Sequence, residues 1–229
     1  MTASSNTRWS LVQAAKGDTP QARAALSDLC AIYYAPVHGF VRHWCGDGDE
    51  ARDLTQAFFA LVLEGGSLDG ADQHQGRFRS FIFGAVKHFI AEQHRHERTL
   101  KRGGNVAMVS DDEARDVADA RLLPPDAEFD RAWACAVLER TLTLLQQEMT
   151  QAGKATVFDE LKPWLAGTAA HGDTAAAAAR LRVSETAVRV LVSRLRKRMR
   201  ELLRDELAQT LSADADVDAE MRFLADALR

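Results

Sequence analysis

Apolar residues recur every three or four positions along most of the chain, and short polar segments interrupt them. This spacing is typical of helices that bury one face. It runs from Ala22 to Tyr33 and from Val37 to Trp44, with Pro36 expected to open the second helix, and it resumes from Phe129 to Leu145. The sequence therefore predicts an all-α fold.

The periodicity is lost in one acidic stretch, which suggests two domains. Residues 111–130 carry eight acids against two arginines, and such a composition is typical of a linker with little structure of its own. We expect one small helical domain over 1–102, a flexible linker over 103–125 and a second helical domain over 126–205. An acidic helical extension over 206–229 follows and is placed to fold back on a basic surface.

The second domain ends in two predicted helices joined by a tight turn. Asp173 or Thr174 is a suitable N-cap for the first helix and Ser184 for the second, because their side-chain oxygens accept from free amides of a first turn. The second helix has one apolar stripe at helical spacing. Its members are Val188, Leu191, Val192, Leu195, Met199, Leu202 and Leu203. This arrangement is a helix-turn-helix.

Charge changes the interpretation of that segment. Residues 180–204 contain nine Arg or Lys and two Glu, a local net charge of +7 in a chain whose total is −4. A local excess of this size is typical of a surface that binds a phosphate backbone. The alternative is a solvated amphipathic helix that carries many arginines.

The predicted helix over residues 50–64 has two faces, each with large apolar residues. One should face the core and comprises Ala51, Leu54, Phe58, Leu61 and Val62. The other comprises Arg52, Gln56, Phe59 and Leu63. Two large apolar residues on a nominally exposed face indicate either a docking surface for another protein or packing under a neighbouring helix.

Residues 77–102 combine seven Lys or Arg and three His with two Glu, and phenylalanines lie between them. Basic residues interleaved with aromatic ones are typical of surfaces that hold single-stranded nucleic acid. We expect at least half of these phenylalanines to lie in the core instead. His88, Glu92 and His96 follow at four-residue steps and could hold a metal, but successive steps drift around the helix, so we expect no metal and no cofactor.

The remaining composition restricts the compartment. Cys30, Cys45 and Cys135 are too widely spaced for a zinc pattern or a paired disulfide framework. We find no signal peptide and no apolar run of membrane-spanning length. The sequence predicts a soluble cytoplasmic protein.

Three motifs in order resemble one family, the extracytoplasmic-function class of bacterial sigma factors. The segment Asp53-Leu54-Thr55-Gln56 with Phe58-Phe59 resembles the helix that binds the polymerase clamp. The segment from Phe78 to Arg98 resembles the one that melts and reads the minus-ten element. Leu181 to Arg198 resembles the helix-turn-helix for the minus-thirty-five element.

This resemblance implies partners and residue roles. The partners would be core RNA polymerase and promoter DNA, and the protein would not be an enzyme. Contacts to polymerase would come from Arg52, Asp53, Gln56, Phe59 and Leu63. Contacts to the melted minus-ten strand would come from Arg79, Lys87, His88, Arg95 and Arg98, beside a loop over 65–76 that could receive a flipped base. Contacts to the minus-thirty-five element would come from Arg182, Ser184, Glu185, Thr186, Arg189, Arg194, Arg196 and Lys197. Arg189 is the best candidate for a base contact.

Two departures from the family pattern predict a control point. Members usually carry acids at the positions of Arg52 and Ala57, which pair with basic residues of polymerase. A cation there adds repulsion and predicts weak basal binding. Thr55 lies between these positions, and a phosphate on it would restore negative charge. We therefore hypothesise that a Ser/Thr protein kinase activates the protein at Thr55; the alternative is a half-buried helix residue.

Two further features bear on DNA binding. Arg182 stands where many helix-turn-helix turns have glycine, so a positive φ there costs about 1 kcal/mol. The acidic tail is placed to mask the DNA-binding arginines. A helix-turn-helix regulator that does not load polymerase and a metal-dependent helical enzyme at His88, Glu92 and His96 remain as alternatives.

Overall fold

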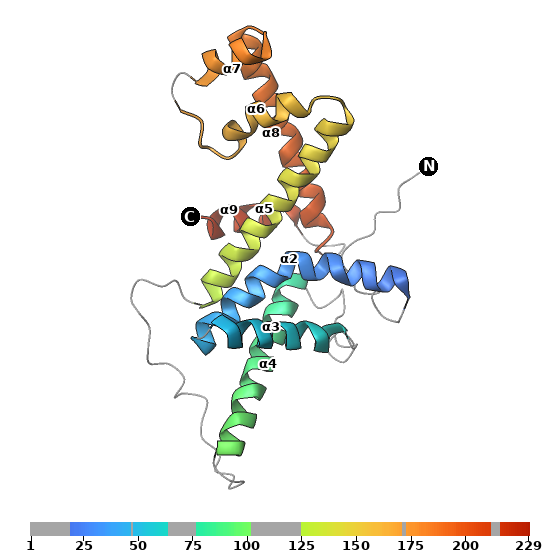
Figure 1. Cartoon of the computed structure of the whole chain (residues 1–229), viewed down its shortest axis with the longest axis vertical. Helices are drawn as coiled ribbons and strands as arrows, with labels where there is room; N and C mark the ends of the chain where they lie inside the picture. Colours follow the sequence, from blue (N-terminus) through green and yellow to red (C-terminus); the bar gives the residue numbers. More distant parts are fainter. Residues whose placement is uncertain (1–18, 47, 64–76, 102–124, 171–172, 212–215) are drawn as a thin grey trace. The chain divides into compact units, whose positions relative to one another are not determined.

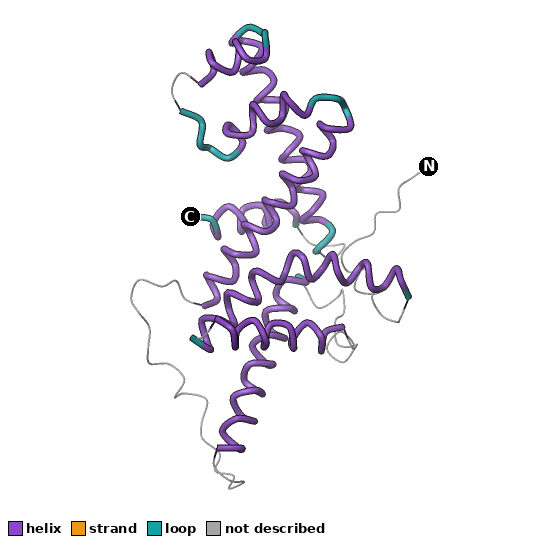
Figure 2. Tube along the Cα trace, in the orientation of Figure 1, coloured by secondary structure: helices purple, strands orange, loops and turns teal. Residues whose placement is uncertain are grey.

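The computed structural model describes residues 19–46, 48–63, 77–101, 125–170, 173–211 and 216–229. In these ranges the chain forms eight helices and no strand (Figure 1, Figure 2). The prediction of an all-α fold is confirmed. The predicted loop over 65–76 and nearly all of the predicted linker over 103–125 lie outside the described residues.

The chain divides into two compact units, and the division falls inside a helix. Unit 1 comprises Met1–Ala136 with Ala208–Arg229, and unit 2 comprises Val137–Leu207. Helix α5 (Pro125–Gln151) therefore begins in unit 1 and ends in unit 2. Its first turns belong to unit 1 because Phe129 is buried there with its ring 4.8 Å from that of Phe83. This division differs from the sequence-based boundary at residue 126.

In unit 1, α2 (Pro20–Cys45) packs against α3 (Gly48–Leu63) and α4 (Phe78–Lys101). Pro36 lies within α2 and does not open a new helix. The core is rich in aromatic residues, since Tyr33 meets Phe78 edge-on at 5.3 Å and Phe58 meets Phe89 at 5.7 Å. More of the phenylalanines of α4 are buried than exposed, as expected.

Helix α3 is rotated relative to the sequence-based prediction. Its buried side chains are Ala51, Thr55, Phe58, Phe59 and Val62. Leu61, which was expected in the core, is exposed, whereas Phe59, which was expected on a docking face, is buried. The reason is a neighbouring helix: Tyr34 of α2 stacks on Phe59 with ring centroids 5.9 Å apart.

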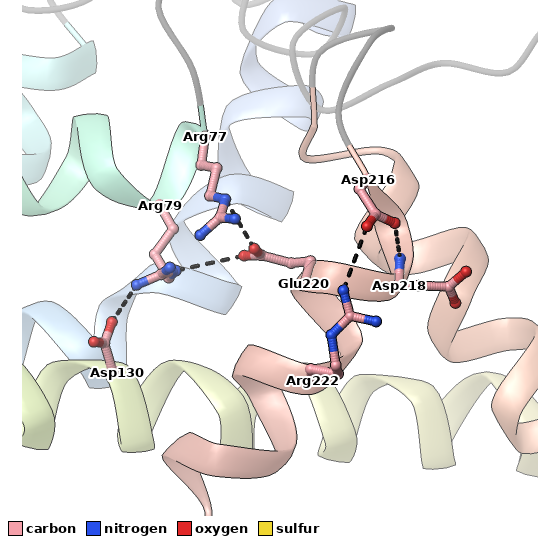
Figure 3. A network of polar contacts seen from close by, with 7 residues as sticks. All are labelled: Arg77, Arg79, Asp130, Asp216, Asp218, Glu220 and Arg222. Atoms are coloured by element: carbon pink, nitrogen blue, oxygen red, sulfur yellow. Dashed lines mark hydrogen bonds and ion pairs between the residues drawn. The ribbon is translucent and has the colours of Figure 1, made fainter.

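The predicted C-terminal helix is present as α9 (Val217–Ala227) and belongs to unit 1. Asp216 caps it by accepting from the amide of Asp218. The Glu220 side chain is only 1% exposed, and its carboxylate lies 3.0 Å from Nε of Arg77 and 3.6 Å from Nε of Arg79 (Figure 3). The acidic tail thus pairs with arginines at the start of α4.

Arg79 connects three helices of unit 1. Its guanidinium donates to Asp130 of α5, and its Cζ lies 3.9 Å from the ring centroid of Phe223 in α9 and 4.9 Å from that of Trp133 in α5. Burial raises the pKa of Asp130, and the positive charge of Arg79 partly offsets this rise. Arg79 is therefore an internal residue of unit 1.

Unit 2 is built from the second half of α5 with α6 (Ala155–Leu165), α7 (Asp173–Leu181) and α8 (Glu185–Ala208). The apolar stripe predicted for α8 faces its core. The core comprises Leu145, Phe158, Leu161, Ala177, Ala178, Val188, Val192, Leu195 and Leu202. At the end of α8, Arg140 donates to the buried carboxylate of Glu206 at 2.8 Å.

Glu220→Gln should destabilise unit 1 by about 3 kcal/mol, because removing one charge of a buried ion pair leaves its partner uncompensated. Hydrogen exchange of full-length protein measures this effect as faster exchange across α4 and α9. The matched control is Asp226→Asn on the same helix, where the ion pair with Arg229 is exposed and contributes little. Equal exchange in both variants would contradict the internal role of this network.

Candidate nucleic-acid interface

The turn between α7 and α8 has a defined backbone geometry. Arg182 has a φ of 55°, its amide donates to the carbonyl of Ala179 at 3.3 Å, and the amide of Val183 donates to that of Ala178 at 3.0 Å. Together these bonds form a Schellman motif, which closes the C-terminus of a helix. Arg182 therefore adopts the positive φ at which a residue with a Cβ is strained.

Ser184 begins the next helix directly after this turn. Its Oγ accepts from the amide of Ala187 at 3.2 Å, and its carbonyl accepts from the amide of Val188 at 3.1 Å. Both bonds are those of an N-cap, so the predicted cap at Ser184 is confirmed. The turn and the cap together fix the direction in which α8 leaves α7.

One face of α8 points to solvent along the whole first half of the helix. Glu185, the first residue of α8, is exposed, as are Arg182 and Ser184 in the turn before it. The exposed face further comprises Thr186, Arg189, Val190, Ser193, Arg194, Arg196, Lys197 and Arg200. We call these eight residues the outward stripe of α8. With five cations and no acid, the stripe has the charge expected of a surface that meets phosphates.

Other arginines of unit 2 are used inside the unit. Arg180 of α7 pairs with Glu160 of α6, with Nη2 2.5 Å from Oε1. Arg198 donates to Glu148 of α5 at 2.6 Å and to Glu201 at 3.1 Å. The hydrogen bond from Arg198 lowers the pKa of Glu148, and the same bond raises the pKa of Arg198. These ion pairs join helices of unit 2, and neither arginine belongs to the exposed face of α8 described above.

The cations of the outward stripe differ in their partners. Arg194, Lys197 and Arg200 make no ion pair with any residue that the structure describes. Arg189 pairs with Glu185 at 3.2 Å, where both side chains are largely exposed. Arg196 donates to the carbonyl of Trp164 at 3.0 Å. An exposed i, i+4 pair is worth only about 0.3–0.5 kcal/mol, so Arg189 can exchange Glu185 for another acceptor at little cost.

A groove of about 530 Å³ runs along one side of the outward stripe. It is lined by Trp164 of α6, Thr174 of α7 and, from α8, by Val188, Arg189, Val192, Ser193, Arg196, Lys197 and Arg200. Four of these residues are cations. Arg200 was missed among the sequence-based DNA contacts, although its position three residues after Lys197 places it on the same face.

In unit 1, the basic residues of α4 fall into two groups. Lys87, His88 and Arg95 are exposed. Lys87 also lies 3.8 Å from Asp126 and 5.0 Å from the ring centroid of Phe83. Arg79 was predicted as a minus-ten contact, but it is 8% exposed, and its guanidinium donates to Asp130 and lies over the ring of Phe223 within unit 1. The side chain of Arg98 lies outside the described residues.

The predicted polymerase contacts on α3 are partly exposed and partly buried. Arg52, Asp53 and Gln56 are exposed, and Arg52 pairs with Asp49 at 3.1 Å. Phe59 is buried, so it is not part of an exposed surface. The side chain of Leu63 lies outside the described residues. Among the described side chains of this helix, the exposed large apolar one is Leu61.

Thr55 lies in the middle of the buried side of α3. Its side chain is 0% exposed, and its hydroxyl donates to the carbonyl of Ala51 at 2.6 Å. The sequence placed it at the border of the core and the exposed face. Because a kinase must reach the hydroxyl, phosphorylation here requires α3 to separate from its neighbours.

The histidines of α4 lie near acids of the same helix. His88 lies 3.8 Å from Glu92, and both are exposed. Within the residues that the structure describes, no group of three His, Cys, Asp or Glu is placed to hold a metal ion. The described helices also include none with the length and apolar character needed to cross a membrane.

Comparison with known proteins leaves the family open. The chain matches no family model, no curated protein and no solved structure. The assignment of function therefore depends on the chemistry of the two units.

Arg182→Gly should stabilise unit 2 by about 1 kcal/mol, because glycine adopts a positive φ without the steric cost that a Cβ imposes. Chemical denaturation of the full chain measures the shift. Arg182→Ala is the control, since it removes the same charge and keeps the Cβ, and it should give no gain. If alanine stabilised as much as glycine, backbone strain at Arg182 would not be the cause.

Proposed function

We propose that the protein is a bacterial sigma factor of the extracytoplasmic-function type, which binds core RNA polymerase and directs transcription from specific promoters. The observation that carries this proposal is the outward stripe of α8, held at a fixed angle by the turn and cap before it. The order of three motifs that resemble this class supports it. Core polymerase and promoter DNA would be its partners, and the cytoplasm its compartment.

The outward stripe suits a helix that enters the major groove of DNA. In such a helix the N-terminal residues meet base edges, while cations further along bind phosphates. Thr186 and Arg189 lie in the first two turns of α8, and Arg189 is free to leave Glu185 for a base. Arg194, Lys197 and Arg200 come later and are suited to the phosphates.

The exposed face of α3 is acidic enough to support a weak electrostatic contact with a basic surface of polymerase. Asp49, Glu50 and Asp53 surround Arg52 and are exposed, so the first turns of α3 keep a net negative charge despite the arginine. A basic partner surface would therefore still be attracted, but less than by the acids that the family usually carries. In α4, Lys87, His88 and Arg95 form the exposed basic row for a melted strand.

A DNA-binding regulator that does not load polymerase is the second candidate. It is favoured by the burial of Phe59 and Arg79, because each was expected to contact a sigma-specific partner and neither is accessible. Such a regulator needs the outward stripe alone. DNA binding and polymerase binding are therefore tested separately.

Lys197→Ala should weaken binding to all duplex sequences by a similar factor and reduce the slope of log K against log salt by about one, as expected for a lost phosphate contact. Fluorescence anisotropy with duplex DNA over a salt series measures both quantities. Lys154→Ala is the matched control, since Lys154 is exposed in unit 2 but lies outside the groove and the stripe. An identical salt slope in wild type and Lys197→Ala would contradict the proposed DNA face.

Ala57→Glu should strengthen binding to core polymerase about fivefold or more, because Ala57 is exposed on α3 where the family carries an acid. Ala57→Lys should weaken binding and serves as the opposite-charge control. Surface-immobilised core polymerase and full-length protein provide the measurement. If the two variants bound equally, α3 would not be the docking helix.

Thr55→Glu should destabilise unit 1 by several kcal/mol, because it places a charge in the buried side of α3. The control is Gln56→Glu, which adds the same charge to the adjacent exposed position and should leave the melting temperature unchanged. Calorimetry and run-off transcription distinguish the two readings of Thr55. A stable Thr55→Glu protein with raised transcription would support the phosphorylation switch.

A further inference from the structure

Val190 is an apolar side chain at the centre of a cationic face. Among the large apolar residues of the described chain it is the most exposed, at 44%. It follows the fully buried Val188 by two residues, which is about 200° around a helix axis. Val190 therefore lies on the side of α8 opposite the core.

Its neighbours on the outward stripe are all polar or charged. Thr186 and Arg194 lie one turn before and one turn after it, and Arg189 and Ser193 lie beside it. A single exposed apolar residue is ordinary on a protein surface. This one differs because the surface around it carries several cations, including Arg194 and Lys197, which have no acidic partner among the described residues.

The surrounding charge decides which partner can cover Val190. An apolar protein surface would have to desolvate the cations beside it, which is costly without acidic partners. A second copy of the chain, docked by the same face, would bring Arg189, Arg194 and Lys197 against their own counterparts, and like charges at an interface cost several kcal/mol. A polyanion, by contrast, pairs with these cations as it covers the valine.

Duplex DNA offers both anionic groups for the cations and an apolar group for the valine. Its phosphates flank the major groove, and the C5-methyl of thymine is the apolar group that the groove presents to an entering helix. We propose that Val190 is a specificity-determining residue that contacts a thymine methyl in the DNA bound by α8. This inference rests on the proposed function, because it requires α8 to enter the major groove.

The experiment begins with full-length protein and a pool of random duplexes, from which the preferred sequence is selected. Each thymine of that sequence is then replaced singly by deoxyuridine, which removes only the methyl group. Wild-type binding should fall about three- to fivefold at one thymine, the effect of losing one buried methyl contact.

Val190→Ala should be insensitive to that replacement, so that valine and methyl are coupled in a double-mutant cycle. Val183→Ala is the matched control: Val183 is a second exposed valine, 39% exposed, but lies in the turn before α8. Val183→Ala should lose as much affinity as wild type when the sensitive thymine is replaced by deoxyuridine. Because Val190 is exposed, its replacement leaves the core of unit 2 intact.

Three outcomes would overturn the inference. The first is that no deoxyuridine replacement weakens wild-type binding. The second is that Val190→Ala loses as much affinity as wild type at the sensitive thymine. The third is that Val183→Ala is as insensitive to the replacement as Val190→Ala. If the protein selects no sequence and binds no duplex, the proposed function fails together with this inference. A selected sequence without coupling to Val190 leaves the proposed function standing and removes the inference alone.

Discussion

A guanidinium that leaves water must be paired with a carboxylate, and this constraint divides the arginines of the protein into two groups. Arg79 is buried in unit 1 and is neutralised by Asp130 and Glu220. Arg198 in unit 2 is paired with Glu148 and Glu201. These pairs connect α4 with α5 and α9, and α8 with α5. On the outward stripe of α8, by contrast, Arg194, Lys197 and Arg200 make no ion pair with any residue that the structure describes.

The division explains why basic composition alone is ambiguous. In residues 77–102, arginines between phenylalanines match a surface for single-stranded nucleic acid. The same composition also matches an internal cation–π cluster, and Arg79 with Phe223 and Trp133 is one. Glu220, an acidic partner of Arg79, lies 141 residues further along the chain. Such a pair cannot be found from local spacing.

Local sequence patterns predicted the features that depend on interactions between residues close in the chain, namely helices and their caps. Helical spacing predicted the all-α class, and the cap at Ser184 follows from the residues of one turn. The sequence could not decide which side of α3 is buried, because both of its faces carry large apolar residues. The contact that decides it is tertiary: Tyr34 of α2 covers Phe59. The assignment of α9 to unit 1 was also open, since an acidic tail can pair with either basic segment.

These contacts also change the proposed place of control. Thr55 carries the only side-chain hydroxyl in α3 (Gly48–Leu63), but it is bonded to Ala51 within a buried face. A charge at that position acts first on the packing of unit 1 and only then on polymerase docking. The outward stripe, in contrast, is exposed and requires no rearrangement to meet DNA.

The most direct test of the account is run-off transcription with full-length protein, core RNA polymerase of the source organism and genomic DNA fragments. Transcripts with defined start sites should appear, should require both the protein and core polymerase, and should be lost when Arg194 and Lys197 are both replaced by alanine. Sequence-specific DNA binding by the protein without any transcript at any fragment would contradict it.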